Sequence, residues 1–148
     1  MKNFKNEIPD KIDAKEIDYL YLKPSGIVDA GKGLFSSIPI YENEIISLFK
    51  GEILSNTEAA KRAKNKQDGY FINMLDGTIM DSKHVKCFAK YANDAEGLGK
   101  RTLKNNAKIT LNENNKVCLV ATMPIKTGDE IFCSYGKKYW VKFRNVYL

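Results

Sequence analysis

The chain consists of short apolar runs that are separated by turn-forming residues about every ten positions. This spacing is typical of β-strands joined by tight turns, and it predicts a mainly β domain with short strands and little helix. The expected strands are residues 19–22, 45–49, 70–75, 78–80, 117–121 and 130–133.

Two local signals add detail to this prediction. Asp76 and Gly77 predict a two-residue hairpin turn, because glycine tolerates the positive φ that such turns require. Ser55 and Glu58 have the spacing of a capping box, and good helix formers follow them. The sequence therefore predicts one helix that begins after Ser55.

Length and composition favour a single domain. The 148 residues are 43% hydrophobic and 28% charged, which is close to the average for globular domains. We expect a polar arm over residues 1–18, a folded domain over residues 19–142 and a short tail over residues 143–148. No run approaches the roughly 18 apolar residues of a membrane span, and the first residues lack an apolar secretory stretch. The sequence predicts an intracellular protein without membrane contact.

The three cysteines, Cys87, Cys118 and Cys133, lie far apart in the chain, without the close pairing that zinc sites show. No metal site is expected. Free cysteines beside apolar neighbours are usually buried, and this is our prediction for Cys87 and Cys118.

Net charge and the lack of simple catalytic motifs argue against several classes of function. The net charge of +6 favours acidic partners, including nucleic acid, but the lysines are spread along the whole chain. The only histidine, His84, has no Ser or Cys motif around it, which argues against a histidine-based triad. Gly31-Lys32-Gly33 lacks the spacing of a dinucleotide or phosphate loop, so by itself it indicates only a tight turn.

A series of motifs follows this turn in a fixed order. It comprises Gly31-Lys32-Gly33-Leu34-Phe35, residues 38–46, residues 49–52, Asp68-Gly69-Tyr70-Phe71-Ile72, Tyr91-Ala92-Asn93-Asp94-Ala95, Asn105-Asn106-Ala107, residues 121–131 and Ser134-Tyr135-Gly136. The series resembles the SET domain of protein-lysine methyltransferases, over roughly residues 19–142. The resemblance implies a β-clip (SET-domain) fold, with several small sheets and a threaded C-terminal segment.

The resemblance also implies S-adenosylmethionine (S-adenosyl-L-methionine) as the cofactor. In SET enzymes a glycine turn, an aromatic residue, an asparagine motif and a C-terminal aromatic contact this cofactor. The matching residues here are Gly31, Lys32, Gly33, Tyr70, Asn93, Asp94 and Trp140. Asp94 departs from the family, which most often has histidine there, and packing in the core is the alternative for Tyr70 and Trp140.

By the same resemblance, Tyr135 is the expected catalytic residue, because it matches the tyrosine of the terminal Tyr-Gly motif. Cys133, Tyr139 and Tyr91 are expected at the substrate channel. In the family, tyrosine at the position of Cys133 restricts the product to fewer methyl groups. The smaller cysteine therefore predicts di- or trimethylation.

The implied function is transfer of a methyl group from S-adenosylmethionine to a protein lysine, with a histone tail as the expected target. Such a substrate would place the protein in the nucleus or at chromatin, with nucleosomal DNA meeting the basic surface. The apolar tail could cover the site or form a homodimer contact. An inactive SET-like binding module and a basic nucleic-acid-binding protein are the alternatives.

Overall fold

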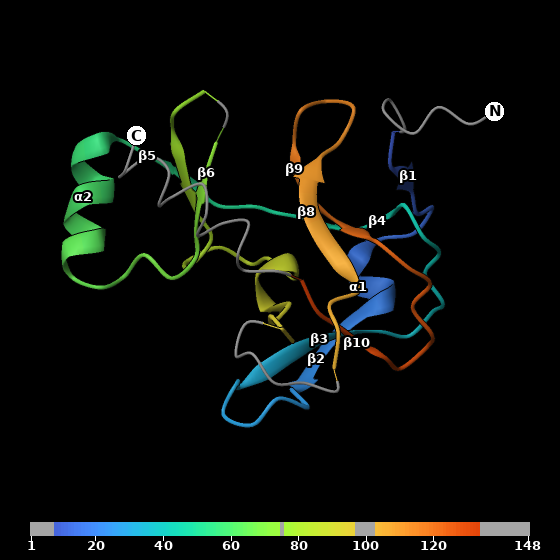
Figure 1. Ribbon diagram of the computed structural model, residues 1–148. Helices are drawn as coiled ribbons and strands as arrows, with labels where there is room; N and C mark the ends of the chain where they lie inside the picture. Colours follow the sequence, from blue (N-terminus) through green and yellow to red (C-terminus); the bar gives the residue numbers. More distant parts are fainter. Residues whose placement is uncertain (1–7, 75, 97–102, 134–148) are drawn as a thin grey trace.

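The structure is a computed structural model that describes residues 8–74, 76–96 and 103–133. The described residues form three small sheets with short helices beside them (Figure 1). The mainly β fold with several small sheets that the sequence predicts is therefore confirmed. No helix among these residues is long and apolar enough to cross a membrane.

The largest sheet has four strands in the order β1-β4-β9-β8. Its first pair is parallel and the other pairs are antiparallel. All residues of the inner strand β9 are buried, which makes this sheet one wall of the core. The strands are β1 (Asp10–Lys11), β4 (Glu44–Leu48), β9 (Val117–Ala121) and β8 (Ala107–Leu111).

Two three-stranded sheets complete the fold, in the orders β10-β3-β2 and β5-β7-β6. Figure 1 shows the second of them on the side of the molecule that carries helix α2. The strands are β2 (Leu20–Pro24), β3 (Lys32–Ser36), β5 (Glu52–Leu54), β6 (Phe71–Asn73), β7 (Ile79–Asp81) and β10 (Glu130–Ile131). The helices are α1 (Glu16–Tyr19), α2 (Asn56–Lys64) and the 3₁₀ turn η1 (Ala89–Tyr91).

The local signals in the sequence are confirmed. Helix α2 begins directly after Ser55, whose Oγ accepts a hydrogen bond from the Glu58 backbone N–H at 3.1 Å. Strands β6 and β7 form the expected antiparallel hairpin, with Gly77 at φ +89° in its connection. The connection is longer than the predicted two-residue turn, because the last paired residues are Asn73 and Ile79. The side chain and backbone N–H of Thr78 donate to Asp76 Oδ1, which closes this turn and lowers the pKa of Asp76.

Several elements were not predicted. Strands β3, β5 and β8 are short and contain charged or small residues, so their own sequences carry little β signal. Pairing with neighbouring strands forms them, as when β8 pairs with β9 along its whole length. Within the expected polar arm, β1 and α1 pack on β4, and Glu16 accepts hydrogen bonds from Ser47 Oγ and the Leu48 N–H.

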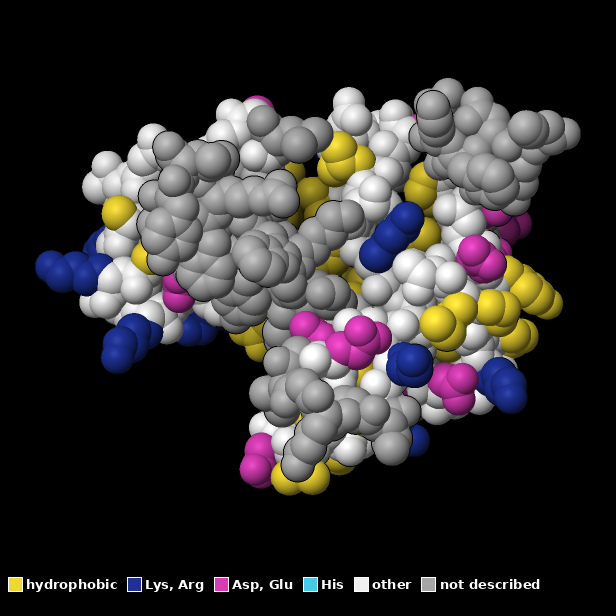
Figure 2. All heavy atoms as spheres, viewed as in Figure 1, with side chains coloured by type: hydrophobic (Ala, Val, Ile, Leu, Met, Phe, Trp, Pro, Cys, Tyr) yellow, Lys and Arg dark blue, Asp and Glu magenta, His cyan; other side chains and the backbone are white. Residues whose placement is uncertain are grey.

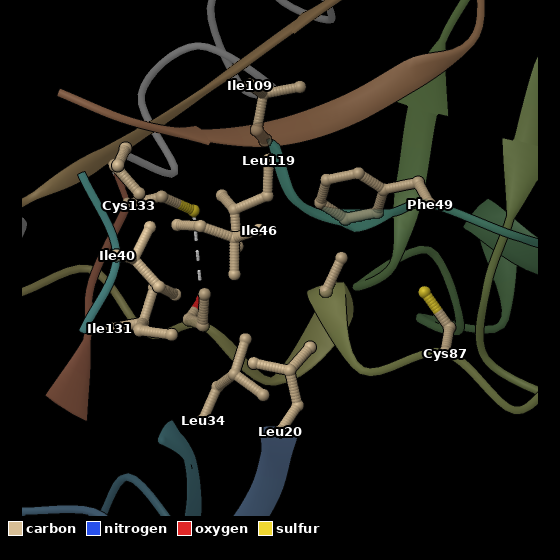
Figure 3. Close-up of a cluster of buried hydrophobic side chains, with 14 of the residues drawn as sticks. Leu20, Leu34, Ile40, Ile46, Phe49, Cys87, Ile109, Leu119, Ile131 and Cys133 are labelled. Carbon is tan, nitrogen blue, oxygen red and sulfur yellow. Dashed lines mark hydrogen bonds between the residues drawn. The ribbon is translucent and has the colours of Figure 1, made fainter. Parts of the chain in front are cut away.

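The main core lies between the sheets and is shown in Figure 3. The three cysteines are free and buried, as predicted for Cys87 and Cys118. Burial raises the pKa of the Cys118 thiol to about 11. The fully buried aliphatic side chains include Leu34, Ile40, Ile46, Leu119 and Ile131.

The C-terminal part of the described chain lies between two earlier segments. Phe132 forms a parallel bridge with Asn93, and Cys133 forms one with Ala107. The Phe132 carbonyl accepts hydrogen bonds from the N–H groups of Asn106 (3.0 Å) and Ala107 (2.9 Å). This segment therefore pairs with both earlier segments up to Cys133, where the described residues end, and its threading stays a prediction.

Candidate functional site

The glycine turn forms a bend that leads into β3. Gly31 has φ +72°, a conformation that glycine adopts without the steric penalty of other residues. The Ser25 N–H donates to the Gly31 carbonyl at 2.8 Å and closes the loop over residues 25–31. Strand β3 then starts at Lys32, so only Gly31 of the three predicted turn residues lies in the bend itself.

Glu130 holds this loop from the opposite strand. Its carboxylate accepts hydrogen bonds from Ser25 Oγ (2.6 Å) and from the Gly26 N–H (2.8 Å). Gly33 lies against the same carboxylate, because a Cβ at this position would stand 2.8 Å from Glu130 Cδ. The sequence did not indicate Glu130 as a site residue, since its partners lie about a hundred positions away and only the β10–β3 pairing brings them together.

Asn93 connects the glycine bend to the C-terminal segment. Its Nδ2 donates to the Lys32 carbonyl at 3.1 Å, and its own carbonyl accepts from the Cys133 N–H at 2.9 Å. Three predicted site residues from distant parts of the chain therefore meet at one junction. Tyr135 follows Cys133 by two positions in the sequence.

Two asparagines hold the segments around this junction. Asn106 Nδ2 donates to the Glu130 carbonyl at 3.0 Å, and its Oδ1 accepts from the Phe132 N–H at 2.8 Å. Asn105 Nδ2 donates to Asp94 Oδ1 at 3.0 Å, while its Oδ1 accepts from the Ala95 N–H at 2.8 Å. Asp94, where the family usually has histidine, is therefore a hydrogen-bond acceptor that orders the loop after Asn93.

The aromatic residues Tyr70 and Tyr91 are brought together by a lysine. Lys90 Nζ lies 5.5 Å from the ring centroid of Tyr70 and 5.4 Å from that of Tyr91. Tyr70 precedes β6 and Tyr91 ends η1, so two separate segments meet here. Nothing in the sequence indicates that Lys90 is buried, because lysine is usually exposed.

Cys133 lies in the core, at 0% exposure. Its thiol is close to Ile40 and Ile46 and donates a weak hydrogen bond to the Ala92 carbonyl at 3.9 Å (Figure 3). The predicted channel role of Cys133 remains a prediction. Three further predicted residues, Tyr135, Tyr139 and Trp140, lie outside the described residues.

Comparison with known protein families identifies the family of this chain. The SET domain family matches residues 31–136, which is well over half of the chain. The chain belongs to the SET-domain family. The match begins at the glycine bend and ends just after Tyr135, so it spans the segments that meet at Asn93.

Solved structures of SET-domain proteins share this fold. A humanized mutant of the Chaetomium thermophilum Polycomb Repressive Complex 2, bound to an inhibitor, is 25% identical over 80% of this chain, with a TM-score of 0.66. The ctPRC2 complex in an autoinhibited conformation, bound to S-adenosylmethionine, is 23% identical over 86% of the chain, with a TM-score of 0.67. This SET domain covers only 15% and 17% of those much longer chains.

Charged side chains show which surfaces of the SET domain are free for partners. Asp10, Asp13 and Asp18 are exposed, whereas Glu16 binds β4 and Glu52 pairs with Arg62 at 2.9 Å. On the face shown in Figure 2, lysine and arginine side chains lie scattered among acidic ones.

The described residues contain no group of three or more His, Cys, Asp and Glu side chains that could hold a metal ion.

Proposed function

We propose that this protein is a protein-lysine N-methyltransferase that uses S-adenosylmethionine and acts on a histone tail. The observation that carries the proposal is the junction at Asn93, which links the glycine bend at Lys32 to the segment that leads to Tyr135. A methyl donor and an acceptor amine must meet at one point, and this junction joins the segments that would hold each of them.

The residues at the bend fit the cofactor. A Cβ at Gly31 would meet no atom within 4 Å, so the backbone is open to a ligand on that side. Gly33 is covered by Glu130 on its corresponding side, so the contact falls to Gly31 and Lys32. Asn93, Asp94, Tyr70 and Trp140 complete the proposed set. When bound, S-adenosylmethionine supplies a methyl group activated by its sulfonium.

The chain's own residues would prepare the acceptor amine. A free lysine has a pKa of about 10.4 and is almost fully protonated at neutral pH. An apolar channel lined by Tyr91, Tyr139 and Cys133 disfavours the ammonium form, so its proton can pass to water. The Tyr135 hydroxyl would then orient the neutral amine. Holding the reactants in this alignment can lower the activation free energy by about 7 to 11 kcal/mol.

The substrate and location belong to the same proposal. A solved relative at 25% identity is part of Polycomb Repressive Complex 2, which supports a protein substrate at chromatin and hence a nuclear location. The small side chain of Cys133 supports di- or trimethylation. The proposal also includes binding of nucleosomal DNA to the basic surface and a homodimer contact through the C-terminal tail. Partner-binding assays test both.

The decisive experiment uses radiolabelled S-adenosylmethionine with core histones, nucleosomes or a host lysate, followed by mass spectrometry of the labelled lysine. We expect transfer to a histone lysine by the wild type. Tyr135→Phe should lower kcat by about a hundredfold or more, as expected for loss of a group that acts at the reacting atoms. Its affinity for the cofactor, measured by calorimetry, should change little.

Tyr41→Phe is the matched control, because Tyr41 is 65% exposed and its hydroxyl removal should leave the rate unchanged. Cofactor binding without any transfer would instead identify the protein as an inactive SET-like binding module, for which Asp94 is the supporting feature. Absence of cofactor binding would overturn both readings.

A further inference from the structure

Lys90 is a buried lysine whose amine is fully engaged. Its residue is only 8% exposed. Within the described part of the chain, Nζ donates to the backbone carbonyls of Ser82 (3.0 Å), Lys83 (3.1 Å) and Val85 (3.1 Å). These bonds use the whole donor capacity of an ammonium group. The side chain therefore has one well-defined position.

The same amine stands over two aromatic rings of the candidate site. Tyr70 and Tyr91 lie at 5.5 and 5.4 Å from Nζ, within the range of cation–π attraction. The rings come from different segments, ahead of β6 and at the end of η1. One atom thus contacts both rings and the loop over residues 82–85.

The three carbonyls account for a donor at this place, because an apolar side chain of similar length could fill the space but could not donate to them. Burying an ammonium group still costs free energy that three neutral carbonyls offset only in part, and the two rings offset more of it. Tyr70 and Tyr91 are the residues proposed above for the cofactor and the substrate channel. Because Lys90 Nζ contacts both rings, its position bears on the distance between them.

We propose that Lys90 is a positioning residue of the methyl-transfer site, which holds Tyr70 and Tyr91 at the spacing that the reaction needs. The inference rests on the proposed function. Lys90 touches neither substrate nor cofactor in this account, and it acts through the two rings.

Lys90→Met removes the charge and keeps the length of the side chain. A displacement of about 1 Å at a reacting centre can cost about a hundredfold in rate, so we expect kcat/KM to fall by about ten- to a hundredfold. The ratio of mono-, di- and trimethyl products should also change, because Tyr91 lies at the proposed channel. Lys90→Arg keeps a cation over both rings and should recover most of the rate.

Lys86→Met is the matched control, since Lys86 is exposed in the same loop. Thermal unfolding of each variant establishes the folded fraction, and rates are compared per folded molecule. If folded Lys90→Met has the kcat/KM and product ratio of Lys86→Met, the inference is overturned while the proposed function stands. If the wild type transfers no methyl group to any substrate, the proposed function itself is overturned.

A measurement on the wild type covers the case in which Lys90→Met does not fold. The ε-methylene protons of Lys90 should show an upfield ring-current shift in the NMR spectrum, because two rings face the amine. Tyr91→Leu should move these signals back toward the range of an exposed lysine. Unshifted Lys90 signals in the wild type would contradict the inference without any activity assay.

Discussion

Glu130 shows how one side chain can organise the loop over residues 25–31, which is proposed to bind the cofactor, without lying in a recognisable motif. It joins Ser25 and Gly26 to the strand that leads toward Cys133, and it occupies the space that a Cβ of Gly33 would need. A side chain at position 33 would therefore push this carboxylate away from its partners Ser25 and Gly26. Glu130 therefore links the loop over residues 25–31 to the C-terminal segment through its hydrogen bonds.

Glu130→Gln should weaken that coupling, because hydrogen bonds to a charged acceptor are roughly twice as strong as neutral ones. We expect the KM for S-adenosylmethionine to rise by about tenfold, a change of about 1.4 kcal/mol, with a smaller effect on kcat. Steady-state kinetics at saturating peptide would measure this. The exposed Glu42→Gln provides the control, and equal KM values for the two variants would rule out the role assigned to Glu130.

At the scale of elements, helix α2 is attached to its sheet by charge. Arg62 donates to Glu52 and Asp81 through Nη1 and to Glu58 through Nε, at 2.8 to 2.9 Å. The hydrogen bond from Arg62 lowers the pKa of Glu58, and the three carboxylates raise the pKa of Arg62. The Asp81 side chain is 0% exposed, so this pairing reaches into the interior.

Arg62→Met should leave the Asp81 carboxylate buried, with the Lys83 N–H as its remaining donor within the described part of the chain. Removing one partner of a buried ion pair typically lowers the free energy of unfolding by about 3 to 5 kcal/mol. We expect a smaller loss in Arg62→Met, because Arg62 is slightly exposed. Urea unfolding at neutral pH would measure the loss. Lys61→Met, at an exposed position of the same helix, should change the free energy of unfolding by less than about 0.5 kcal/mol. Similar losses in both variants would disprove the attachment.

For the whole molecule, the described part of the N-terminal arm is built into the fold. The Glu16 carboxylate accepts hydrogen bonds from the Ser47 hydroxyl and the Leu48 N–H. The Tyr19 hydroxyl donates to the Ile46 carbonyl at 2.7 Å. Burial, followed by the charges of Glu16 and Glu44, raises the pKa of Tyr19. These contacts reinforce β4, a central strand of the largest sheet.

Glu16→Ala should therefore destabilise the protein and leave its chemistry intact. Unpaired donors on β4 would cost about 1 to 3 kcal/mol, measured as a lower midpoint of urea unfolding. The kcat of the folded protein should stay within twofold of wild type, because these contacts lie on β4 and not at the Asn93 junction. Asp18→Ala, which removes an exposed carboxylate nearby, is the control. An unchanged midpoint in Glu16→Ala would show that the arm contributes nothing to stability.

The sequence alone determined those features that depend on neighbouring residues. The cap at Ser55 predicts α2, and Asp76-Gly77 predicts the β6–β7 hairpin, because capping and positive φ are decided within a few positions. The burial of Cys87 and Cys118 followed from their apolar neighbours. The ordered motifs from the glycine bend to Tyr135 were sufficient to indicate the SET family.

Only the tertiary structure decided which distant groups share a site. The partners of Glu130, the two rings over Lys90, and the bridges of Phe132 and Cys133 to residues 93 and 107 join positions far apart in the chain. Such contacts depend on strand pairing and on the packing of segments against each other, and a short stretch of sequence carries little information about either. The physical reason is that hydrogen-bond donors and acceptors have the same chemistry wherever they stand, and the fold alone selects their partners.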